Sequence, residues 1–246
     1  MYISVLLPSI LALIALYKNK LTLPGLIAAW IMGIIITYFG GISAFIALAL
    51  TFILTIMSDK LKKTKEDKRR NIYQIFSNVL TCSVSLVLYY FFKNEVFIVV
   101  YYAVIGGSLA DTLASSIGPL AKEKPIHPLT LKKMEIGESG AISILGLVVS
   151  LLGGLIIGVV YYFTYFKVLN LVLISLMGLF GSYVDSLLGA LFQAKYECNK
   201  CHEYTENSIH CGLNAKLIKG IGFINNNAVN FSSNVIIFLI TLLLYV

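Results

Sequence analysis

Residues 106–140 read GGSLADTLASSIGPLAKEKPIHPLTLKKMEIGESG, and they follow directly on an apolar run at residues 96–105. The stretch places Asp111 inside a segment that is still apolar enough to span a membrane. A charged side chain at the centre of a spanning helix costs about 2.5 kcal/mol or more, so intramembrane acids mark functional sites. The stretch therefore predicts a membrane helix with a functional carboxylate.

The same pattern occurs a second time, with Asp185 following Asp111 by 74 residues. The motif G-S-x-x-D-[ST]-L covers residues 107–113 and again residues 181–187. Of the 12 acidic residues, only these two aspartates lie within strongly apolar segments. Two interpretations are open: the acids build a shared site, or they are polar positions that hold helices together beside small residues.

Composition places the chain in the membrane. Of its 246 residues 58% are hydrophobic and 13% are charged, whereas soluble domains carry about 25% charged residues. We expect an all-α polytopic membrane protein with about eight transmembrane helices, and the parallel repeat lies in the fifth and seventh of them. The apolar runs of spanning length fall at residues 2–17, 23–39, 42–57, 75–92, 96–113, 141–163, 168–191 and 229–246. Gly154 and Gly158, in G-x-x-x-G spacing, predict a close-packing face on the sixth.

Charge sets the expected orientation. With the N-terminus outside, 17 of the 19 Lys and Arg residues fall in loops facing the cytoplasm, as the positive-inside rule requires. Both termini then face outside, and the long loops face the cytoplasm. Since the net charge of +7 is explained by topology, we expect no nucleic acid partner. The two motif helices run in the same direction, so their carboxylates can meet in one cytoplasm-facing cavity.

Two further polar clusters border the apolar segments. Arg70, Gln74 and Asn78 have the spacing of one helical stripe, which should face protein or a cavity rather than lipid. The basic residues within 60–65 have another interpretation, as an anchor to anionic lipid headgroups. Asparagines 226, 227 and 230 open the last helix and need hydrogen-bond partners. They could satisfy the helix end, hold a nucleotide or orient metal-bound water.

A glycine-containing segment, residues 137–140, stands directly before the sixth expected helix. Free backbone N–H groups and the positive end of a helix dipole make such a segment suitable for an anion such as phosphate. The alternative is an ordinary N-cap built on Ser139. Lys132 and Lys133 lie close by in the sequence.

The loop at residues 198–211 reads CNKCHEYTENSIHC. Its cysteines, with His210 or His202 as the fourth ligand, could form a tetrahedral zinc site. Free thiols or a labile disulfide are the alternative. The string C-x-x-C-H also matches haem attachment, but that chemistry is normally extracytoplasmic, whereas the charge pattern puts this loop inside. The candidate zinc ligands are Cys198, Cys201, His210 and Cys211.

Six motifs occur in a characteristic order. They are R-N-x-x-Q-x-x-x-N (70–78), G-S-x-x-D-T-x-A-S-x-x-G-P (107–119), G-x-x-G (137–140), L-L-G-G (151–154), G-S-x-x-D-S-x-x-G-A-x-x-Q (181–193) and N-N-A-V-N (226–230). In this order, over residues 70–233, the chain resembles the integral-membrane phytyl-phosphate kinases of plants and their animal and microbial relatives, formerly a domain of unknown function. It is more distantly similar to CTP-dependent polyprenol kinases and CDP-lipid synthases. Many relatives carry Trp, Glu and Asp where Leu113, Ser116 and Asn225 stand here.

The resemblance implies transfer of a phosphoryl group from a nucleoside triphosphate, expected to be CTP, to a prenyl monophosphate such as phytyl or geranylgeranyl phosphate. Residues 1–246 then form a single membrane-embedded catalytic domain, with a basic loop at 58–74, a catalytic loop at 114–140 and a Cys/His loop at 192–225. We expect Asp111 and Asp185 to hold Mg²⁺, with Lys133 as a further catalytic residue. Substrate and nucleotide are expected to contact Arg70, Gln74, Asn78, Ser108, Thr112, Ser115, Lys132, Gly137, Ser139, Gly140, Ser182, Ser186, Asn226, Asn227 and Asn230.

Two other activities fit the same residues. A cytidylyltransferase that makes a CDP-lipid would use the same metal and nucleotide groups and release pyrophosphate. An acid-coupled membrane transporter would use the two aspartates as coupling groups. The lipid bilayer is an expected partner in every case, and a homodimer and a structural Zn²⁺ remain open.

Overall fold

The computed structural model describes residues 2–61 and 69–245, so residues 62–68 of the predicted basic loop lie outside the described part. Within it the chain forms seven α-helices, and six are long and apolar enough to cross a membrane. The seven helices are α1 (Tyr2–Tyr17), α2 (Leu23–Asp59), α3 (Ile72–Phe92), α4 (Val96–Ile117), α5 (Ile144–Tyr165), α6 (Val168–Phe192) and α7 (Asn226–Leu244). The shortest, α1, is not among the six candidate spans. A 3₁₀ helix, η1 (Gly118–Leu120), follows α4. The predicted helical membrane fold is confirmed.

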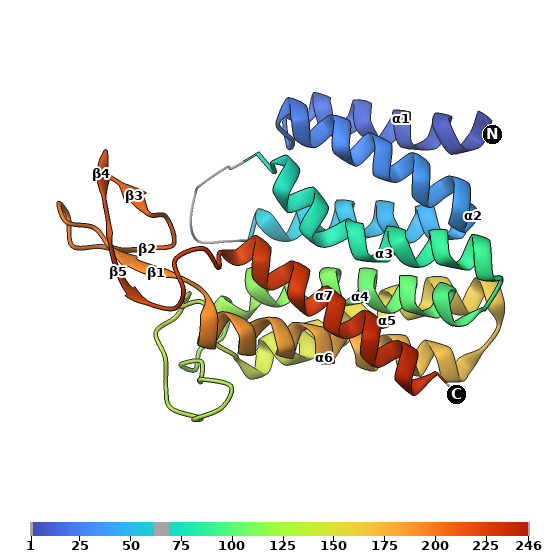
Figure 1. Ribbon diagram of the computed structural model, residues 1–246. Coiled ribbons are helices and arrows are strands. Elements are labelled where there is room, and N and C mark those ends of the chain that lie inside the picture. Colours follow the sequence, from blue (N-terminus) through green and yellow to red (C-terminus); the bar gives the residue numbers. More distant parts are fainter. Residues whose placement is uncertain (1, 62–68, 246) are drawn as a thin grey trace.

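Helix α2 doubles back on itself at Gly41, whose φ of 74° and ψ of −170° are not helical. A straight helix of its 37 residues would be about 55 Å long, yet both of its ends lie beside Arg70. Asp59 Oδ2 is 3.2 Å from Arg70 Nη2, and a Cβ on Gly25 would lie 2.7 Å from the Arg70 carbonyl oxygen. Figure 1 shows the reversal. The segments expected at 23–39 and 42–57 are the two arms of α2 on either side of this reversal, and the count of eight separate helices is not confirmed.

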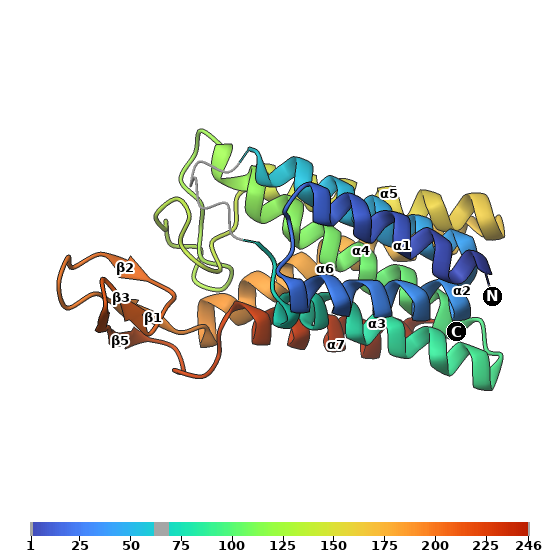
Figure 2. The same cartoon turned by 90° about the horizontal axis from the view of Figure 1, so that it is seen from above.

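A small β-module, residues 195–219, stands between α6 and α7 and was not predicted. Its strands are β1 (Lys195–Glu197), β2 (Tyr204–Thr205), β3 (Ile209–His210), β4 (Leu213–Asn214) and β5 (Lys216–Lys219). An antiparallel sheet has the order β2-β1-β5, and β3 pairs with β4 as a hairpin. Figures 1 and 2 place the module beyond the end of the helix bundle that is opposite to both termini. The loop between η1 and α5 lies at the same end (Figure 2).

Helix α4 is the centre of the bundle. Every residue from 98 to 110 is buried, and α4 packs against α2, α3, α5, α6 and α7. This explains how a helix can carry the polar Ser108 in its buried part: other helices, rather than lipid, surround it. Ser108 Oγ is within 3.2 Å of both the Asn78 carbonyl oxygen on α3 and Asn234 Oδ1 on α7.

Glycines bring α4, α5 and α6 into backbone contact. A Cβ on Gly178 of α6 would lie 2.5 Å from the Cα of Gly154 on α5. A Cβ on Gly153 of α5 would lie 2.8 Å from the Cα of Ala110 on α4. Real Cβ atoms do not approach backbone this closely, so any larger residue must push the helices apart. The close-packing role predicted for the glycines of the sixth expected helix, here α5, is confirmed.

This packing predicts opposite outcomes for two alanine substitutions. Gly178→Ala should lower the free energy of unfolding by about 1–3 kcal/mol, as overpacking of a fitted interior does. Gly106→Ala is the matched control, because its Cβ would meet Ile157 and Gly154 at 3.6 and 3.7 Å, which is ordinary contact. Thermal unfolding of the purified variants in detergent measures the difference. Equal tolerance of both substitutions would contradict the close contact at Gly178.

Candidate functional site

The two copies of the repeated motif lie on α4 and α6, which run in the same direction (Figure 1). Their glycines meet, since a Cβ on Gly181 would lie 3.4 Å from the Cα of Gly107. Asp111 and Asp185 each follow their glycine by four residues, which is about one helical turn. Both aspartates line one cavity of about 230 Å³, and the Asp111 carboxylate acts electrostatically on that of Asp185.

Helix α7 fixes the orientation of the buried Asp185 side chain. Ser233 Oγ donates a hydrogen bond to Asp185 Oδ2 at 3.1 Å. With its amide nitrogen turned toward α6, Asn230 donates to the same oxygen at 3.0 Å and to the Asn226 carbonyl oxygen at 3.0 Å. Of the asparagines expected from the sequence, Asn230 therefore contacts the second aspartate directly. Asn225 is the N-cap of the helix and accepts from the Ala228 N–H at 3.1 Å.

The acidic cavity, as we call the space between α4, α6, the loop before α5 and the start of α7, gathers many of the residues expected from the sequence. These are Asp111, Ser115, Gly137, Ser139, Gly140, Ser182, Asp185, Ser186 and Asn226. Its charged lining side chains are all carboxylates: Asp111, Glu123, Glu138, Asp185 and Glu206. No Lys, Arg or His side chain lines it in the part of the chain that the structure describes. The cavity therefore favours cations, or anions that arrive together with cations.

The segment at residues 137–140 lines this cavity as a loop and not as a helix terminus. Helix α5 begins at Ile144, three residues later than expected, and Ser143 caps it by accepting from the Gly146 N–H at 3.0 Å. Gly140 has a φ of 78°, and a Cβ there would lie 2.3 Å from the Ala190 nitrogen on α6. The expectation that these residues open the helix is wrong, because the loop packs on the last turns of α6 instead.

Several expected residues lie away from the acidic cavity. Lys132 and Lys133 are exposed and do not line it, so the structure does not bring Lys133 to the carboxylates. Asn227 does not line it either, and Asn230 reaches the site only through Asp185.

Gln193 is a site residue that the sequence analysis did not single out. Its side chain is 4% exposed and lines the acidic cavity. Among the described residues its Nε2 has no hydrogen-bond partner, and leaving a buried donor unpaired costs about 1–3 kcal/mol. The signal was present in the sequence, since Gln193 closes the longer form of the second motif copy.

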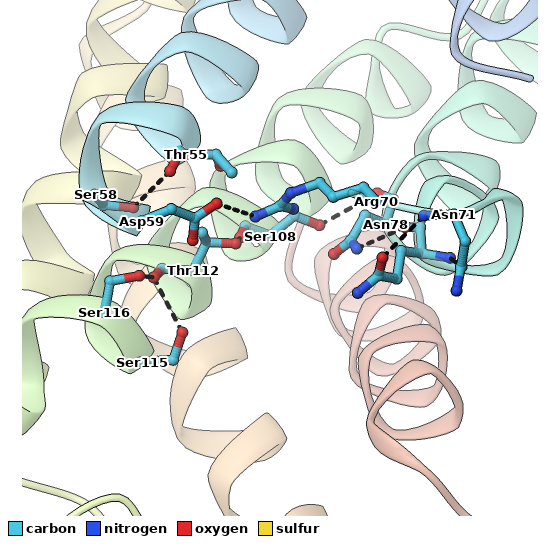
Figure 3. A network of polar contacts seen from close by, with 11 residues as sticks. Thr55, Ser58, Asp59, Arg70, Asn71, Asn78, Ser108, Thr112, Ser115 and Ser116 are labelled. Carbon is cyan, nitrogen blue, oxygen red and sulfur yellow. Dashed lines mark hydrogen bonds and ion pairs between the residues drawn. The ribbon is translucent and has the colours of Figure 1, made fainter. Parts of the chain in front are cut away.

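A second, apolar cavity of about 100 Å³ lies between α1, α2, α3 and α4. Aromatic and aliphatic side chains such as Trp30 and Phe45 make up most of its wall. Its polar residues include Arg70, Gln74, Asn78, Ser108 and Thr112. Arg70 is its only charged lining residue within the described ranges, and Figure 3 shows it turned toward Asp59, to which Arg70 Nη2 donates at 3.2 Å.

The polar stripe of the sequence analysis forms, but Arg70 is not part of a helix. Helix α3 begins at Ile72, and Asn71 and Gln74 form a reciprocal capping box at its start. Arg70 reaches the apolar cavity from the preceding segment, and Gln74 and Asn78 reach it from the helix.

Helix α4 separates the two cavities and contributes to both. Thr112 lines the apolar cavity and Asp111 lines the acidic one, and successive residues of a helix point about 100° apart. Both cavities therefore border the same turn of α4. Ser116 is buried, donates to the Thr112 carbonyl oxygen at 2.8 Å (Figure 3) and lines neither cavity.

The β-module is held against the acidic cavity by an ion pair. Lys195 Nζ lies 2.8 Å from Glu138 Oε1, and this hydrogen bond lowers the pKa of the Glu138 carboxyl. Glu206, in the turn between β2 and β3, lines the cavity from the module side. The module therefore borders the mouth of the site.

Comparison with known proteins gives the following matches. The chain matches the family described as Integral membrane protein DUF92 over residues 6–238. It is 31% identical over 207 residues to the uncharacterized membrane protein MJ0933 of Methanocaldococcus jannaschii, covering 82% of this chain and 87% of that relative. It is 28% identical over an alignment of 271 positions to Protein PGR of Arabidopsis thaliana, covering 94% of this chain and 91% of that relative. No solved structure matches the chain.

The Glu138–Lys195 pair predicts a pH-dependent attachment of the β-module. Because the folded-state pKa of Glu138 is lowered, the pair stabilises above the usual carboxyl pKa of about 4.3 and is lost as the pH falls through the lowered value. Protection of residues 195–219 from hydrogen exchange should therefore decrease over that acidic range. Glu138→Gln should give low protection at all these pH values. A variant with the same pH profile as the unsubstituted chain would rule the pair out as the attachment.

Proposed function

The chain belongs to the DUF92 family of integral membrane proteins, and we propose that it transfers a phosphoryl group from a nucleoside triphosphate to a prenyl monophosphate. The observation that carries the proposal is that one turn of α4 borders both the acidic cavity, with Asp111 and Asp185, and an apolar cavity, in which Arg70 is the one arginine among the described lining residues. The motif resemblance to phytyl-phosphate kinases suggests the same reaction, with CTP as the expected donor.

The chemistry of the apolar cavity's lining supports such an acceptor. A prenyl monophosphate has a long hydrocarbon tail and one anionic end, and burying each CH₂ group contributes about 0.8 kcal/mol. Arg70 can bind a phosphate with two parallel hydrogen bonds. Gln74 and Asn78 line the same cavity. The side chains of Ser108 and Thr112 would lie on the α4 side of the bound acceptor.

The acidic cavity fits a metal–nucleotide complex. A triphosphate carries several negative charges, so it can enter a pocket lined by carboxylates only together with cations. Mg²⁺ binds oxygen ligands, normally one or two carboxylates together with phosphate oxygens and water. Asp111 and Asp185 are the pair that would hold it, and Ser233 and Asn230 orient the second of them. When bound, Mg²⁺ would neutralise charge on the transferred phosphoryl group.

The remaining lining residues supply hydrogen bonds and position. Ser115 and Ser139 offer hydroxyl donors, and Gln193 offers its unpaired Nε2. The acceptor oxygen already belongs to a phosphate monoester anion, so the transfer needs no strong general base. The protein would therefore contribute mainly by aligning the donor in one cavity with the acceptor in the other, with α4 bordering both. Such alignment is the main requirement in phosphoryl transfer.

The direct test is an assay of purified protein with Mg²⁺, each of the four nucleoside triphosphates, and phytyl or geranylgeranyl phosphate. We expect prenyl diphosphate by mass spectrometry, with CTP as the best donor. Asp111→Asn and Asp185→Asn should each lower turnover at least about 100-fold, because Mg²⁺ requires the anionic oxygen that the amide lacks. Glu135→Gln is the control, since this exposed acid lines neither cavity.

Other outcomes would identify other activities. Release of pyrophosphate with formation of a CDP-lipid would show a cytidylyltransferase. Nucleotide-independent flux into sealed vesicles would show a transporter. If either asparagine variant keeps near-normal turnover, the aspartates only connect helices, and the paired-carboxylate mechanism fails.

We further propose that the acidic cavity faces the cytoplasm, because 17 of the 19 basic residues then lie on that side. In intact cells a cysteine at Glu123, which lines the cavity, should be shielded from a membrane-impermeant thiol reagent. A cysteine at Asn94, between α3 and α4, should be labelled. Cys201 and Cys211 lie in the β-module at the cavity end, so the unsubstituted chain should stay unlabelled. The reverse labelling pattern would place the site outside.

A further inference from the structure

Four metal-binding side chains converge in the β-module, away from the two aspartates. The Sγ atoms of Cys198, Cys201 and Cys211 and a ring nitrogen of His210 all lie within 4.8 Å of one another. They come from separate places in the module: the segment after β1, the end of β3 and the residue that follows it. All four are outside the helices, and the proposed phosphoryl transfer does not use them.

The separations among Cys201, His210 and Cys211 are those of ligands around one tetrahedral ion. With Zn–S near 2.3 Å and Zn–N near 2.0 Å, tetrahedral geometry separates two sulfurs by about 3.8 Å and a sulfur from a nitrogen by about 3.5 Å. Cys201 Sγ and Cys211 Sγ are 3.8 Å apart. His210 Nδ1 lies 3.5 Å from Cys201 Sγ and 3.4 Å from Cys211 Sγ. The same sulfur–sulfur distance is far longer than the roughly 2.05 Å of a disulfide.

We infer that Cys198, Cys201, His210 and Cys211 bind a structural Zn²⁺. Four protein ligands close a tetrahedral shell and leave no position for substrate, which is typical of structural rather than catalytic zinc. The sequence left the fourth ligand open between two histidines, and the geometry selects His210. His202 Nδ1 instead faces Glu197 Oε1 at 3.4 Å.

The local backbone supports a metal knuckle. The Lys200 N–H donates to Cys198 Sγ at 3.4 Å, which orients this buried sulfur within the C-x-x-C turn. Cys211 and Gly212 have φ values of 52° and 77°, so the chain turns sharply where the second pair of ligands meets the first. Such a turn places His210 and Cys211, which are adjacent in sequence, around the same point.

The module also lacks the apolar core that would fold it without a metal. Of residues 195–219 only Tyr196 and Cys198 are buried, and no strand is longer than four residues. Strands this short are not stable alone in water, and a zinc site can supply the missing folding energy. The ion would thereby hold Lys195 and Glu206 at the mouth of the acidic cavity.

The test begins with the full-length protein purified without chelator. Mass spectrometric metal analysis should find about one equivalent of zinc. Replacement by Co²⁺ should give the visible absorption bands of tetrahedral, thiolate-ligated cobalt. Cys201→Ser, Cys211→Ser and His210→Ala should each lose the metal. The matched controls are Cys82→Ser, whose thiol is buried on α3, and His202→Ala, and both should keep a full equivalent.

A second measurement covers variants that fail to fold. Removing zinc from the unsubstituted protein with a strong chelator should make residues 195–219 sensitive to protease while helical circular dichroism stays unchanged. Protein that contains no zinc and takes up no Co²⁺ would overturn the inference. So would equal zinc loss in His202→Ala and His210→Ala, or a disulfide between Cys201 and Cys211 in the freshly purified protein.

Discussion

Backbone contact between α4, α5 and α6 is the constraint on which the rest of the structure depends. In a bilayer the hydrophobic effect does not drive helices together, because lipid tails are as apolar as the side chains. Small residues that allow close van der Waals contact must therefore supply the affinity. Gly154 and Gly178 meet almost atom to atom, and Gly107 and Gly181 lie side by side. Because each aspartate stands one turn beyond its motif glycine, the same contact that packs the helices also brings Asp111 and Asp185 to one cavity. The packing of these helices and the formation of the acidic cavity therefore depend on the same contact.

Two carboxylates in one membrane-embedded cavity repel each other, and helix α7 offsets part of that cost at Asp185. Helix α7 contributes Ser233 and Asn230 to Asp185, but no basic side chain lines the cavity within the described residues. The carboxylate lining that the structure describes attracts cations. In the proposed reaction, a nucleoside triphosphate would enter this cavity together with such cations.

Each of the two cavities matches a different one of the proposed substrates. The apolar cavity, bordered by α1 and both arms of α2, has a mostly hydrocarbon lining that matches a prenyl tail. Arg70 is the one charged residue of that lining within the described part of the chain. The acidic one opens toward the loop before α5 and the β-module. Asp111 and Thr112 are neighbours on α4 but line different cavities. In the proposed reaction, a phosphate bound at Arg70 would therefore lie on a different side of this helix from the carboxylates. The β-module, with the zinc ion proposed to stabilise it, would then border only the acidic cavity, where the nucleotide is proposed to bind.

The sequence by itself determined the membrane class, the apolar segments, the repeated aspartate motif and the Cys/His cluster. These follow from local properties: hydropathy, a motif of fixed spacing and a short ligand string. Only the tertiary structure decided that α2 reverses at Gly41, that Ser143 rather than the preceding glycines caps α5, and that Lys132 and Lys133 stay outside the cavity. It also selected His210 over His202 and brought Arg70 to an apolar pocket. Those outcomes depend on which distant backbones can touch, and a one-dimensional pattern of residue types does not contain that information.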